Sequence, residues 1–446
     1  MNLFVRVTAT VIIAQTSLFS QSILSAESID SVKSAYSAIS DQNVSSAETE
    51  GLKAFVAKKY QGKKLTDGNQ DHLIERIKEG GGYAFWVFES PTAKAVTVVT
   101  QKDRWPMIKL EGTNYFVAAE KFPDQTGVNY RFDVDGVRYP AGGGGGRFGF
   151  ETYPMHPDSV EQPNVPKGQL LDMGQHTGKT HYPNVTRQWW VYVPSQYDPK
   201  NANETGLIVF HDGGGYCKGE RNACTVLDNL IAKKQIPVTI AVFVNPGTRP
   251  PAKPGQEGQS NRSNEYDTCT PRFVNFLDEE ILPIVREKYP FSEKPEHHAV
   301  CGASSGGSCA FTCAWYRPDL FGHVISFIGS FCDFRPLNAY PTPESTQLPT
   351  GDAFGPWKTA HDYPALLRKT HPRKPIRVFL QDGDNDVDNQ LGHWFIANQD
   401  MAAALNFAGY DYEFVTGHGY HSGNHGKAIL PETILWAFGE KGGEPR

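Results

Sequence analysis

Short apolar runs recur at regular spacing between residues 80 and 140, each followed by polar or turn-forming residues. The last run ends at Asp135-Gly136, a dipeptide typical of tight β-hairpins. This spacing predicts a small all-β domain with strands at residues 83–88, 95–100, 114–118 and 130–134. Residues 27–75 are polar with short helical patches such as 52–60, and they predict a partly helical leader.

From about residue 185 the pattern changes to strands that alternate with helices. We expect strands at residues 189–193, 207–210, 238–244, 298–301, 324–328, 376–381 and 412–415. We expect helices at residues 223–234, 271–289, 397–408 and 428–438, the second of them with Thr270 as N-cap and Pro271 in its first turn. Repeated βα units predict an α/β fold with a doubly wound, mainly parallel sheet.

Five consecutive glycines, 142–146, and a proline-rich stretch through Pro166 separate the two patterns. This composition is typical of a linker, so we place a domain boundary near residue 160. The predicted organisation is a signal peptide at 1–26, a leader at 27–75, the β-domain with its linker at 76–160, and an α/β domain at 161–446.

The N-terminus has the features of an export signal. Arg6 is the only charged residue before Glu27, residues 7–20 are mostly apolar or small, and Ser25-Ala26 offers small residues for cleavage. We therefore expect a secreted or periplasmic protein without a further membrane segment. The net charge of −6 and the lack of a basic block argue against nucleic acid or an anionic membrane as a partner.

The seven cysteines all lie between residues 217 and 332. Cys217 and Cys224 are close enough in sequence to bridge a loop in an oxidising compartment. Cys309 and Cys313 lie four residues apart on an expected helix, a spacing that favours small buried thiols. Paired CxxC motifs are missing from the sequence, so no zinc site is expected.

The strongest chemical signal is Gly302-Ala303-Ser304-Ser305-Gly306-Gly307. It fits the G-x-S-x-G pattern between a strand and a helix. A nucleophile on so sharp a turn sits in strained backbone, and its neighbours must be small. The turn exposes the Ser304 hydroxyl and directs helix N-terminal amides at a developing oxyanion. The alternative is an ordinary Gly/Ser-rich loop before a helix.

A nucleophilic serine needs a histidine base and an acid that orients it, and in this fold they follow the serine in the order acid, histidine. After the strand 376–381 come Asp382, Asp384, Asp386 and Asp388. After the strand 412–415 come His418, His421 and His425. The aspartate series also resembles a calcium loop, but its sixth and twelfth positions are Val387 and His393 where glycine and glutamate are required.

Several of these stretches together resemble one family. The C-terminal 260 or so residues are similar to the enterochelin-esterase-like branch of the α/β-hydrolases, which includes the feruloyl and acetylxylan esterases of carbohydrate esterase family one. The matching stretches are Asn261–Asp267, Gly302–Gly307, Gln381–Asp386 and Gly419-Tyr420-His421. The resemblance implies Ser304 as nucleophile, Asp386 as acid and His421 as base, with no cofactor. The β-domain, through Tyr130-Arg131-Phe132 and Asp135-Gly136, resembles the early-set immunoglobulin-like domains that precede some esterases and glycan-active enzymes.

Other residues are candidates for the oxyanion hole and the substrate walls. The Ser305 amide is one expected oxyanion donor, and Gly213 or Gly214 in the loop after the strand 207–210 is the other. Arg262, Glu265 and Asp267 are expected to form a salt-bridged loop, although Arg262 is also a candidate for substrate contact. His393 and Trp394 follow the acid loop, where they would line a subsite or belong to the core.

These features predict a secreted serine esterase that acts through an acyl-enzyme. Export and the attached β-domain favour acetyl or feruloyl esters of an extracellular glycan as substrate. The alternatives are a siderophore esterase, an acyltransferase, a peptidase with the same triad, and a non-catalytic glycan-binding protein. The sequence does not indicate the oligomeric state.

Overall fold

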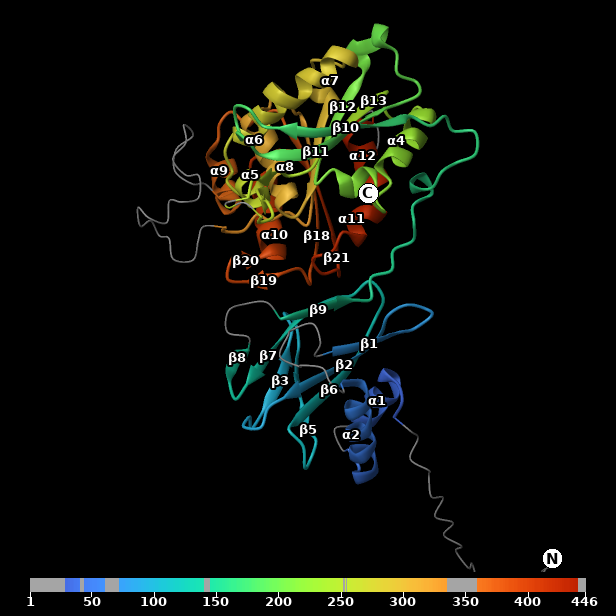
Figure 1. Cartoon of the computed structure of the whole chain (residues 1–446), viewed down its shortest axis with the longest axis vertical. Coiled ribbons are helices and arrows are strands. Elements are labelled where there is room, and N and C mark those ends of the chain that lie inside the picture. Colours follow the sequence, from blue (N-terminus) through green and yellow to red (C-terminus); the bar gives the residue numbers. More distant parts are fainter. Residues whose placement is uncertain are drawn as a thin grey trace, which may run out of the picture.

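The computed structural model describes residues 29–40, 44–60, 72–139, 145–251, 253, 255–334 and 359–439. Figure 1 shows two parts, a β-domain and an α/β domain, with two leader helices on the side of the β-domain that faces away from the α/β domain. The expected signal peptide at residues 1–26 lies outside the described residues. Among the residues that are described, none of the helices is long and apolar enough to cross a bilayer.

Two antiparallel sheets make up the β-domain, defined here as residues 72–151. One has the order β1-β2-β6-β5 and consists of β1 (His72–Arg76), β2 (Gly82–Glu89), β6 (Tyr115–Phe122) and β5 (Ile108–Lys109). The other has the order β4-β3-β7-β8, with β9 also paired to β7, and consists of β4 (Arg104–Pro106), β3 (Val96–Val99), β7 (Gly127–Val134), β8 (Val137–Tyr139) and β9 (Gly146–Gly149). Between them lies an aromatic core that includes Trp86, Phe122, Tyr130 and Phe148.

The predicted hairpin at Asp135-Gly136 is confirmed. Val134 pairs with Val137, and the two turn residues have φ values of 51° and 84°. Positive φ at both central positions is typical of the turn that matches strand twist in a two-residue hairpin.

The leader packs on the β-domain as two helices, α1 (Val32–Ile39) and α2 (Ser46–Tyr60). Leu52, Phe55 and Val56 of α2 are buried against Phe85 and Val87 of β2. Strand β1 begins at His72, so the β-domain starts slightly earlier than the expected residue 76.

The glycine run does not connect the two domains. Gly146 begins β9, and a side chain there would overlap the Tyr130 ring, since a Cβ would lie 2.1 Å from the Tyr130 hydroxyl oxygen. The crossing is made by the following proline-rich stretch, which includes the 3-10 turn η1 (Pro157–Ser159). Asn229 anchors this stretch by donating to the carbonyls of Asp158 and Val160.

The α/β domain is built on a sheet of ten strands in the order β15-β14-β11-β13-β12-β16-β17-β18-β21, with β10 paired to β11. The pairs from β13 to β21 are parallel, and those at the β11 edge are antiparallel. The strands are β10 (Gln169–Thr177), β11 (Thr186–Val193), β12 (Gly206–His211), β13 (Thr239–Val244), β14 (Thr248–Arg249), β15 (Gln259–Ser260), β16 (His298–Ala303), β17 (His323–Phe327), β18 (Arg377–Gly383) and β21 (Asp411–Gly417).

Helices cover both faces of this sheet, as predicted for a doubly wound fold (Figure 1). One face carries α4 (Ala223–Ala232) and α12 (Leu430–Phe438), with α3 (Gly214–Cys217) and α11 (Asn424–Ala428) nearby. The other carries α5 (Arg262–Tyr266), α6 (Arg272–Phe276), α7 (Leu282–Lys288), α8 (Ser305–Tyr316), α9 (Tyr363–Lys369) and α10 (Trp394–Phe407).

The helix expected at 271–289 is interrupted. A π-helical turn, Leu277–Ile281, separates α6 from α7, and α6 begins after Pro271 without the side-chain cap expected from Thr270. The π turn contains Glu280, which accepts hydrogen bonds from the amides of Lys179, Thr180 and His181. This local irregularity joins the helix to the loop between β10 and β11.

The described cysteines are all free thiols, so the expected bridge between Cys217 and Cys224 is wrong in this structure. Burial raises the pKa of the Cys217 thiol to about 11 and that of Cys224 to about 12. Disulfide formation requires a thiolate, and burial of this kind disfavours it.

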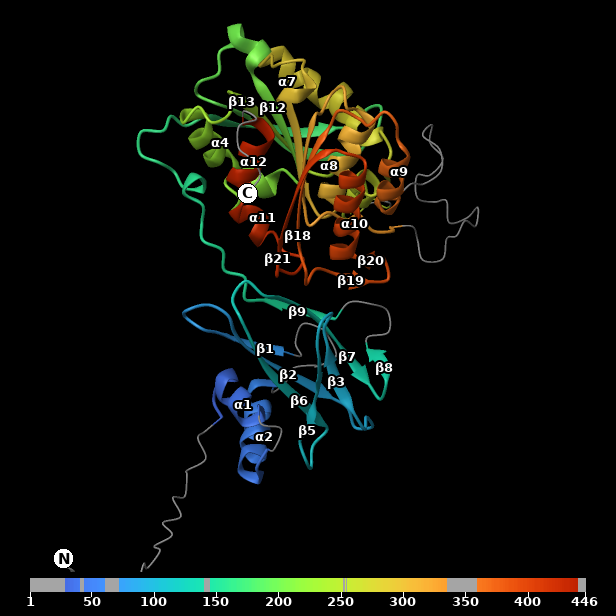
Figure 2. The ribbon, with the colours of Figure 1, turned by 180° about the vertical axis from the view of Figure 1, so that it is seen from behind.

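The ends of β18 and β21 and the hairpin of β19 (Asp388–Asn389) and β20 (Gly392–His393) face the β-domain, as both views show (Figures 1 and 2). Parallel α/β sheets bind ligands at the carboxyl ends of their strands. The β-domain is therefore next to the edge where a site is expected.

Candidate active site

Ser304 lies on the turn between β16 and α8. Its φ of 59° and ψ of −128° are unusual for a residue with a side chain. The turn is held by its amide, which donates to the Phe327 carbonyl, and by the Ser308 amide, which donates to the Ser304 carbonyl. Gly302 is required because a Cβ there would lie 2.2 Å from the Gly306 carbonyl oxygen. The backbone therefore has the form that the glycine spacing predicts.

His421 connects Ser304 to Asp386. The Ser304 Oγ lies 2.8 Å from His421 Nε2, and His421 Nδ1 lies 2.6 Å from Asp386 Oδ1. An ionised Asp386 only accepts, so Nδ1 carries the ring proton and Nε2 is free to accept the serine proton. Asp386 is fully buried while the His421 side chain is 17% exposed. This is the geometry of a nucleophile, a base and an orienting acid.

The competing acids and histidines have other partners. Asp384 pairs with Lys102 at 2.8 Å and with His418 at 3.0 Å, and His418 is 69% exposed. His425 stacks on Tyr153 and lies 3.2 Å from the Gln381 amide. Asp388 is exposed at the start of the β19–β20 hairpin. Of the candidates in the acid and base loops, the structure brings only Asp386 and His421 together with Ser304.

A second buried carboxyl group lies beside the acid. Asp382 accepts from the Gly383 amide and from Asn398 Nδ2, at 2.7 and 2.8 Å. Burial and the neighbouring Asp386 carboxylate raise the pKa of Asp382 well above its usual value. Both effects favour the protonated form of the Asp382 carboxyl group.

Trp394 supports the histidine and serine. It is buried, its ring meets that of His421 edge to face at 5.9 Å, and its Nε1 donates to Ser330 Oγ. Ser330 Oγ lies 3.3 Å from Ser304 Oγ. His393 caps α10 instead, since its Nδ1 accepts from the Ile396 amide at 3.4 Å. Helix α10 consequently begins at Trp394, three residues before the expected start.

The glycine amides expected to complete the oxyanion hole are already used. The Gly213 amide donates to the Val244 carbonyl at 3.1 Å, and the Gly214 amide donates to Asn245 Oδ1 at 2.9 Å. The expectation that either one donates to the oxyanion does not fit this structure. Ser305 is the first residue of α8, where the amide has no acceptor within the helix, so its role as an oxyanion donor stays a prediction.

Arg262 stands beside the nucleophile turn. It makes a two-pronged ion pair with Asp212 at 2.8 and 2.9 Å, and its Nη2 reaches the Ala303 carbonyl at 3.4 Å. Glu265 pairs instead with Arg187, so the expected cluster is divided between two ion pairs. Burial raises the pKa of Asp267 to about 6, and the hydroxyls of Ser305 and Ser263 oppose this shift.

The β-domain holds both catalytic loops through contacts that the sequence did not reveal. Gln101 Nε2 donates to the Asp386 carbonyl and Asn129 Nδ2 to the Asn385 carbonyl. Glu151, just after β9, accepts from the Tyr420 amide at 2.7 Å and from the Ser422 hydroxyl, so it binds both neighbours of His421. No motif marks these residues, because their role depends on how the two domains pack.

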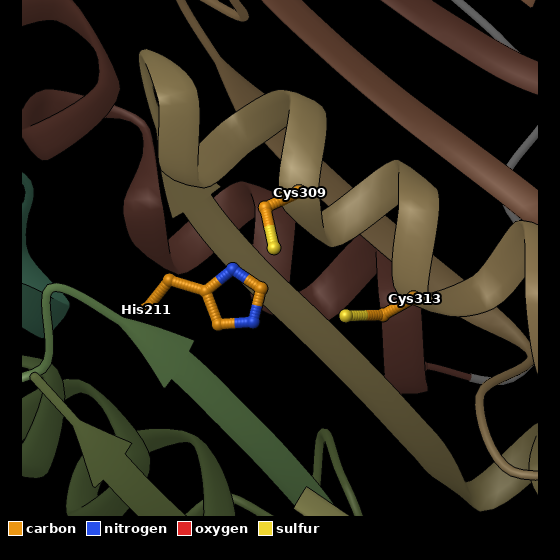
Figure 3. A group of neighbouring side chains, drawn as sticks. All are labelled: His211, Cys309 and Cys313. Atoms are coloured by element: carbon orange, nitrogen blue, oxygen red, sulfur yellow. The ribbon is translucent and has the colours of Figure 1, made fainter. Parts of the chain in front are cut away.

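A group of possible metal ligands lies behind the nucleophile turn. His211, Cys309 and Cys313 are buried, and their donor atoms lie within 4.8 Å of one another (Figure 3). His211 Nδ1 lies 3.0 Å from the Gly306 carbonyl, which fixes the proton on Nδ1 and turns Nε2 toward the thiols. Three such donors suit a thiophilic metal ion, and structural zinc sites use four. A thiol that donates to Nε2 explains the same arrangement without an ion.

Comparisons with known proteins agree with this geometry. The family described as Putative esterase matches residues 180–430. The chain belongs to this family. The protein is therefore a carboxylic ester hydrolase of the enterochelin-esterase-like branch that the motifs indicated. Its α/β domain has the α/β-hydrolase type of fold.

Individual relatives are distant. An iron(III) enterobactin esterase of Escherichia coli K12 is 24% identical over 180 residues, which is 40% of this chain and 40% of that protein. The match therefore spans well under two thirds of the curated relative. The crystal structure of ferric enterobactin esterase from Salmonella typhimurium aligns with a TM-score of 0.50 and 17% identity, over 82% of this chain and 96% of that one. A ferulic acid esterase of carbohydrate esterase family one from Anaeromyces mucronatus aligns with a TM-score of 0.44 and 18% identity, over 64% and 97% of the two chains.

Proposed function

We propose that this esterase is an exported serine hydrolase that removes acyl groups from an extracellular glycan. The hydrogen-bonded series Ser304, His421 and Asp386, at 2.8 and 2.6 Å, carries the proposal. His421 takes the Ser304 proton as Oγ attacks the ester carbonyl, and the proton passes to the departing alcohol. A water molecule that His421 then deprotonates cleaves the acyl-enzyme and frees the acid. Asp386 keeps the imidazole in the required tautomer, and the Ser305 amide donates to the oxyanion.

The glycan substrate and the export are supported by the rest of the chain. Residues 1–26 have the composition of a signal peptide. We assign residues 27–71 to the leader, 72–160 to an immunoglobulin-like β-domain with its linker, and 161–446 to the catalytic domain. Sandwich domains of this type accompany glycan-active enzymes, which favours acetyl or feruloyl glycan esters as substrates.

A siderophore esterase is the second candidate function. It is favoured by the relatives named above, of which two act on iron-bound enterobactin according to their names. The predicted export favours the glycan substrate, because siderophore esters are expected to be broken down after uptake.

Replacing the nucleophile tests the proposed function. The protein without residues 1–26 and its Ser304→Ala variant are assayed on an aryl acetate, methyl ferulate, acetylated xylan and an iron-loaded catecholate trilactone. We expect acetate or ferulate release by the unmodified protein, and a loss of about 10³-fold or more in the variant. Ser195→Ala is the matched control, since it removes the hydroxyl of an exposed serine just after β11, away from the triad.

Each other outcome selects an alternative. Ester cleavage of the trilactone alone indicates a siderophore esterase. Acyl transfer to an added alcohol in preference to water indicates an acyltransferase. Cleavage of a peptide amide with no ester cleavage indicates a peptidase. Equal inactivity of both proteins on all substrates, together with glycan binding, indicates a non-catalytic binding protein.

A further inference from the structure

Three arginines share one face of the second β-domain sheet. Tyr130 and Phe132 of β7 point into the aromatic core, so the alternating residues Asn129, Arg131 and Asp133 point the other way. Residues directly opposite in an antiparallel pair lie on the same face. Asn129 pairs with Arg147 of β9, and Asp133 pairs with Arg138 of β8. Arg131, Arg138 and Arg147 therefore lie together on the side away from the core.

This face forms one wall of a cavity of about 370 Å³. The three arginines line it from the β-domain, and residues Val387 to Asn389, directly after the catalytic Asp386, line it from the α/β domain. Figures 1 and 2 both place the β19–β20 hairpin next to β9. The volume is within the range of roughly 300–1,000 Å³ found for small-molecule sites.

The cavity has an excess of positive charge. Asp133, on the same face, is bound to Arg104 at 2.7 Å. Within the described part of the chain, no ion pair is found for Arg131, Arg138 or Arg147, and Asp388 is the one carboxylate among the residues that line the cavity. Three cations held close together repel one another, so an anionic ligand would relieve their repulsion.

The position of the cavity relative to the triad is fixed. Gln101 and Asn129, which also line it, donate to the carbonyls of Asp386 and Asn385. Lys102 adds an ion pair to Asp384 at 2.8 Å. A group bound by the arginines is thus held at a defined place beside the acid loop.

We propose that this cavity, lined by Arg131, Arg138 and Arg147, binds a carboxylate of the substrate, a uronic acid on the same glycan that carries the scissile ester. The inference rests on the proposed function. The planar guanidinium matches a carboxylate with two parallel hydrogen bonds, and the neighbouring amide side chains suit sugar hydroxyls. The enzyme would then select esters that lie close to an acidic sugar.

Two acetylated xylo-oligosaccharides that differ only in a glucuronic acid branch test this selection. We expect the unmodified enzyme to favour the branched one by roughly tenfold in kcat/KM, the size of one hydrogen-bonded charge pair in a partly open site. In Arg131→Gln/Arg147→Gln this ratio should fall to about one. The control Lys94→Gln/Lys121→Gln removes the same charge from exposed positions of the β-domain and should keep the ratio.

Binding separates this inference from the proposed function. Calorimetry with glucuronosyl-xylotriose and with neutral xylotetraose reports on the cavity whether or not an ester is cleaved. Binding of the acidic sugar that is lost in the arginine variant supports the site, and Arg131→Lys/Arg147→Lys, which keeps the charge, should bind at an intermediate level. A ratio of one in an active wild-type enzyme, or equal binding of both sugars, overturns it while the esterase function stands. Equal binding of the acidic sugar by the arginine variant also overturns it.

Discussion

Buried carboxyl groups surround the nucleophile, and they differ in charge. Asp386 must be ionised to stabilise the His421 imidazolium. Burial and that same charge raise the pKa of Asp382, four residues earlier. Asp267, beside Ser305, has a pKa raised to about 6 by burial. Burial therefore favours the protonated form of Asp382, and it favours the protonated form of Asp267 below about pH 6.

Asp267 should make the free energy of unfolding depend on pH. Between about pH 4 and 6 the unfolded chain releases a proton from this group that the folded protein retains. Stability therefore falls as pH rises through this window, by up to about 3 kcal/mol for a shift of about two units. Asp267→Asn removes the ionisation. The free energy of unfolding of the variant, relative to that of the wild type, should therefore rise between pH 4 and 6 and remain constant above pH 6. Urea unfolding at several pH values measures this difference.

The control for this experiment is Asp103→Asn, which changes an exposed carboxyl group on the β-domain. Its stability curve should run parallel to that of the wild type. If the Asp267→Asn curve is also parallel, the carboxyl group is not the source of the pH dependence.

At the scale of secondary structure elements, a buried ion pair joins strand β11 to helix α5. Arg187 meets Glu265 with two hydrogen bonds at 2.8 and 3.0 Å, and both side chains are fully buried. Glu265 also accepts from the Gly247 amide and from Asn261 Nδ2. The Glu265 carboxylate thus holds the N-terminal end of α5, the helix that carries Arg262.

Glu265→Gln should destabilise the fold by about 3–5 kcal/mol, because it leaves the Arg187 charge buried and uncompensated. The double change Arg187→Met/Glu265→Gln should cost less than the sum of the single changes, since neither partner is then left charged. Glu161→Gln, which breaks an exposed pair with Lys167, should change stability by less than about 1 kcal/mol. Equal losses for the buried and exposed variants, measured by denaturant unfolding, would contradict this account.

The elements that the sequence predicted are those whose signal is local. Buried strands such as β12 and β13 are continuous apolar runs, and the nucleophile turn has its own glycine spacing. Chain order and strand ends limited the acid and the base to a few aspartates and histidines, and the family resemblance then selected Asp386 and His421. The sequence carries no signal for which backbone amides remain free to bind an oxyanion. Gly213 and Gly214 have the expected residue type, but their amides already donate to the Val244 carbonyl and to Asn245 Oδ1.

At the scale of the whole molecule, the β-domain contacts the loop that carries the proposed base, His421. The Gly127 amide donates to the His418 carbonyl at 2.8 Å, and a Cβ at Gly127 would lie 2.0 Å from the Tyr420 nitrogen. The loop that carries His421 therefore lies directly on the β-domain. The sequence could not reveal this contact, because Glu151 and Tyr420 are 269 residues apart and belong to different domains.

Glu151 should control how well His421 is positioned. Glu151→Ala removes the acceptor for the Tyr420 amide and the Ser422 hydroxyl, each a hydrogen bond to a charged group. Loss of one such bond costs about 1.5–3 kcal/mol, so kcat should fall by roughly 10- to 100-fold if the loop shifts. Glu151→Gln keeps one acceptor oxygen and should recover part of the activity.

The rate at which an organophosphonate labels Ser304 provides a readout that a general loss of stability would not move. Labelling requires an aligned His421, so it should slow in Glu151→Ala in proportion to kcat, at a temperature where the variant remains folded by circular dichroism. Glu161→Ala, an exposed glutamate in the linker whose partner Lys167 is also exposed, should leave both rates unchanged. If Glu151→Ala lowers the melting temperature but labels Ser304 at the wild-type rate, the β-domain only stabilises the protein, and the catalytic loops hold their geometry without it.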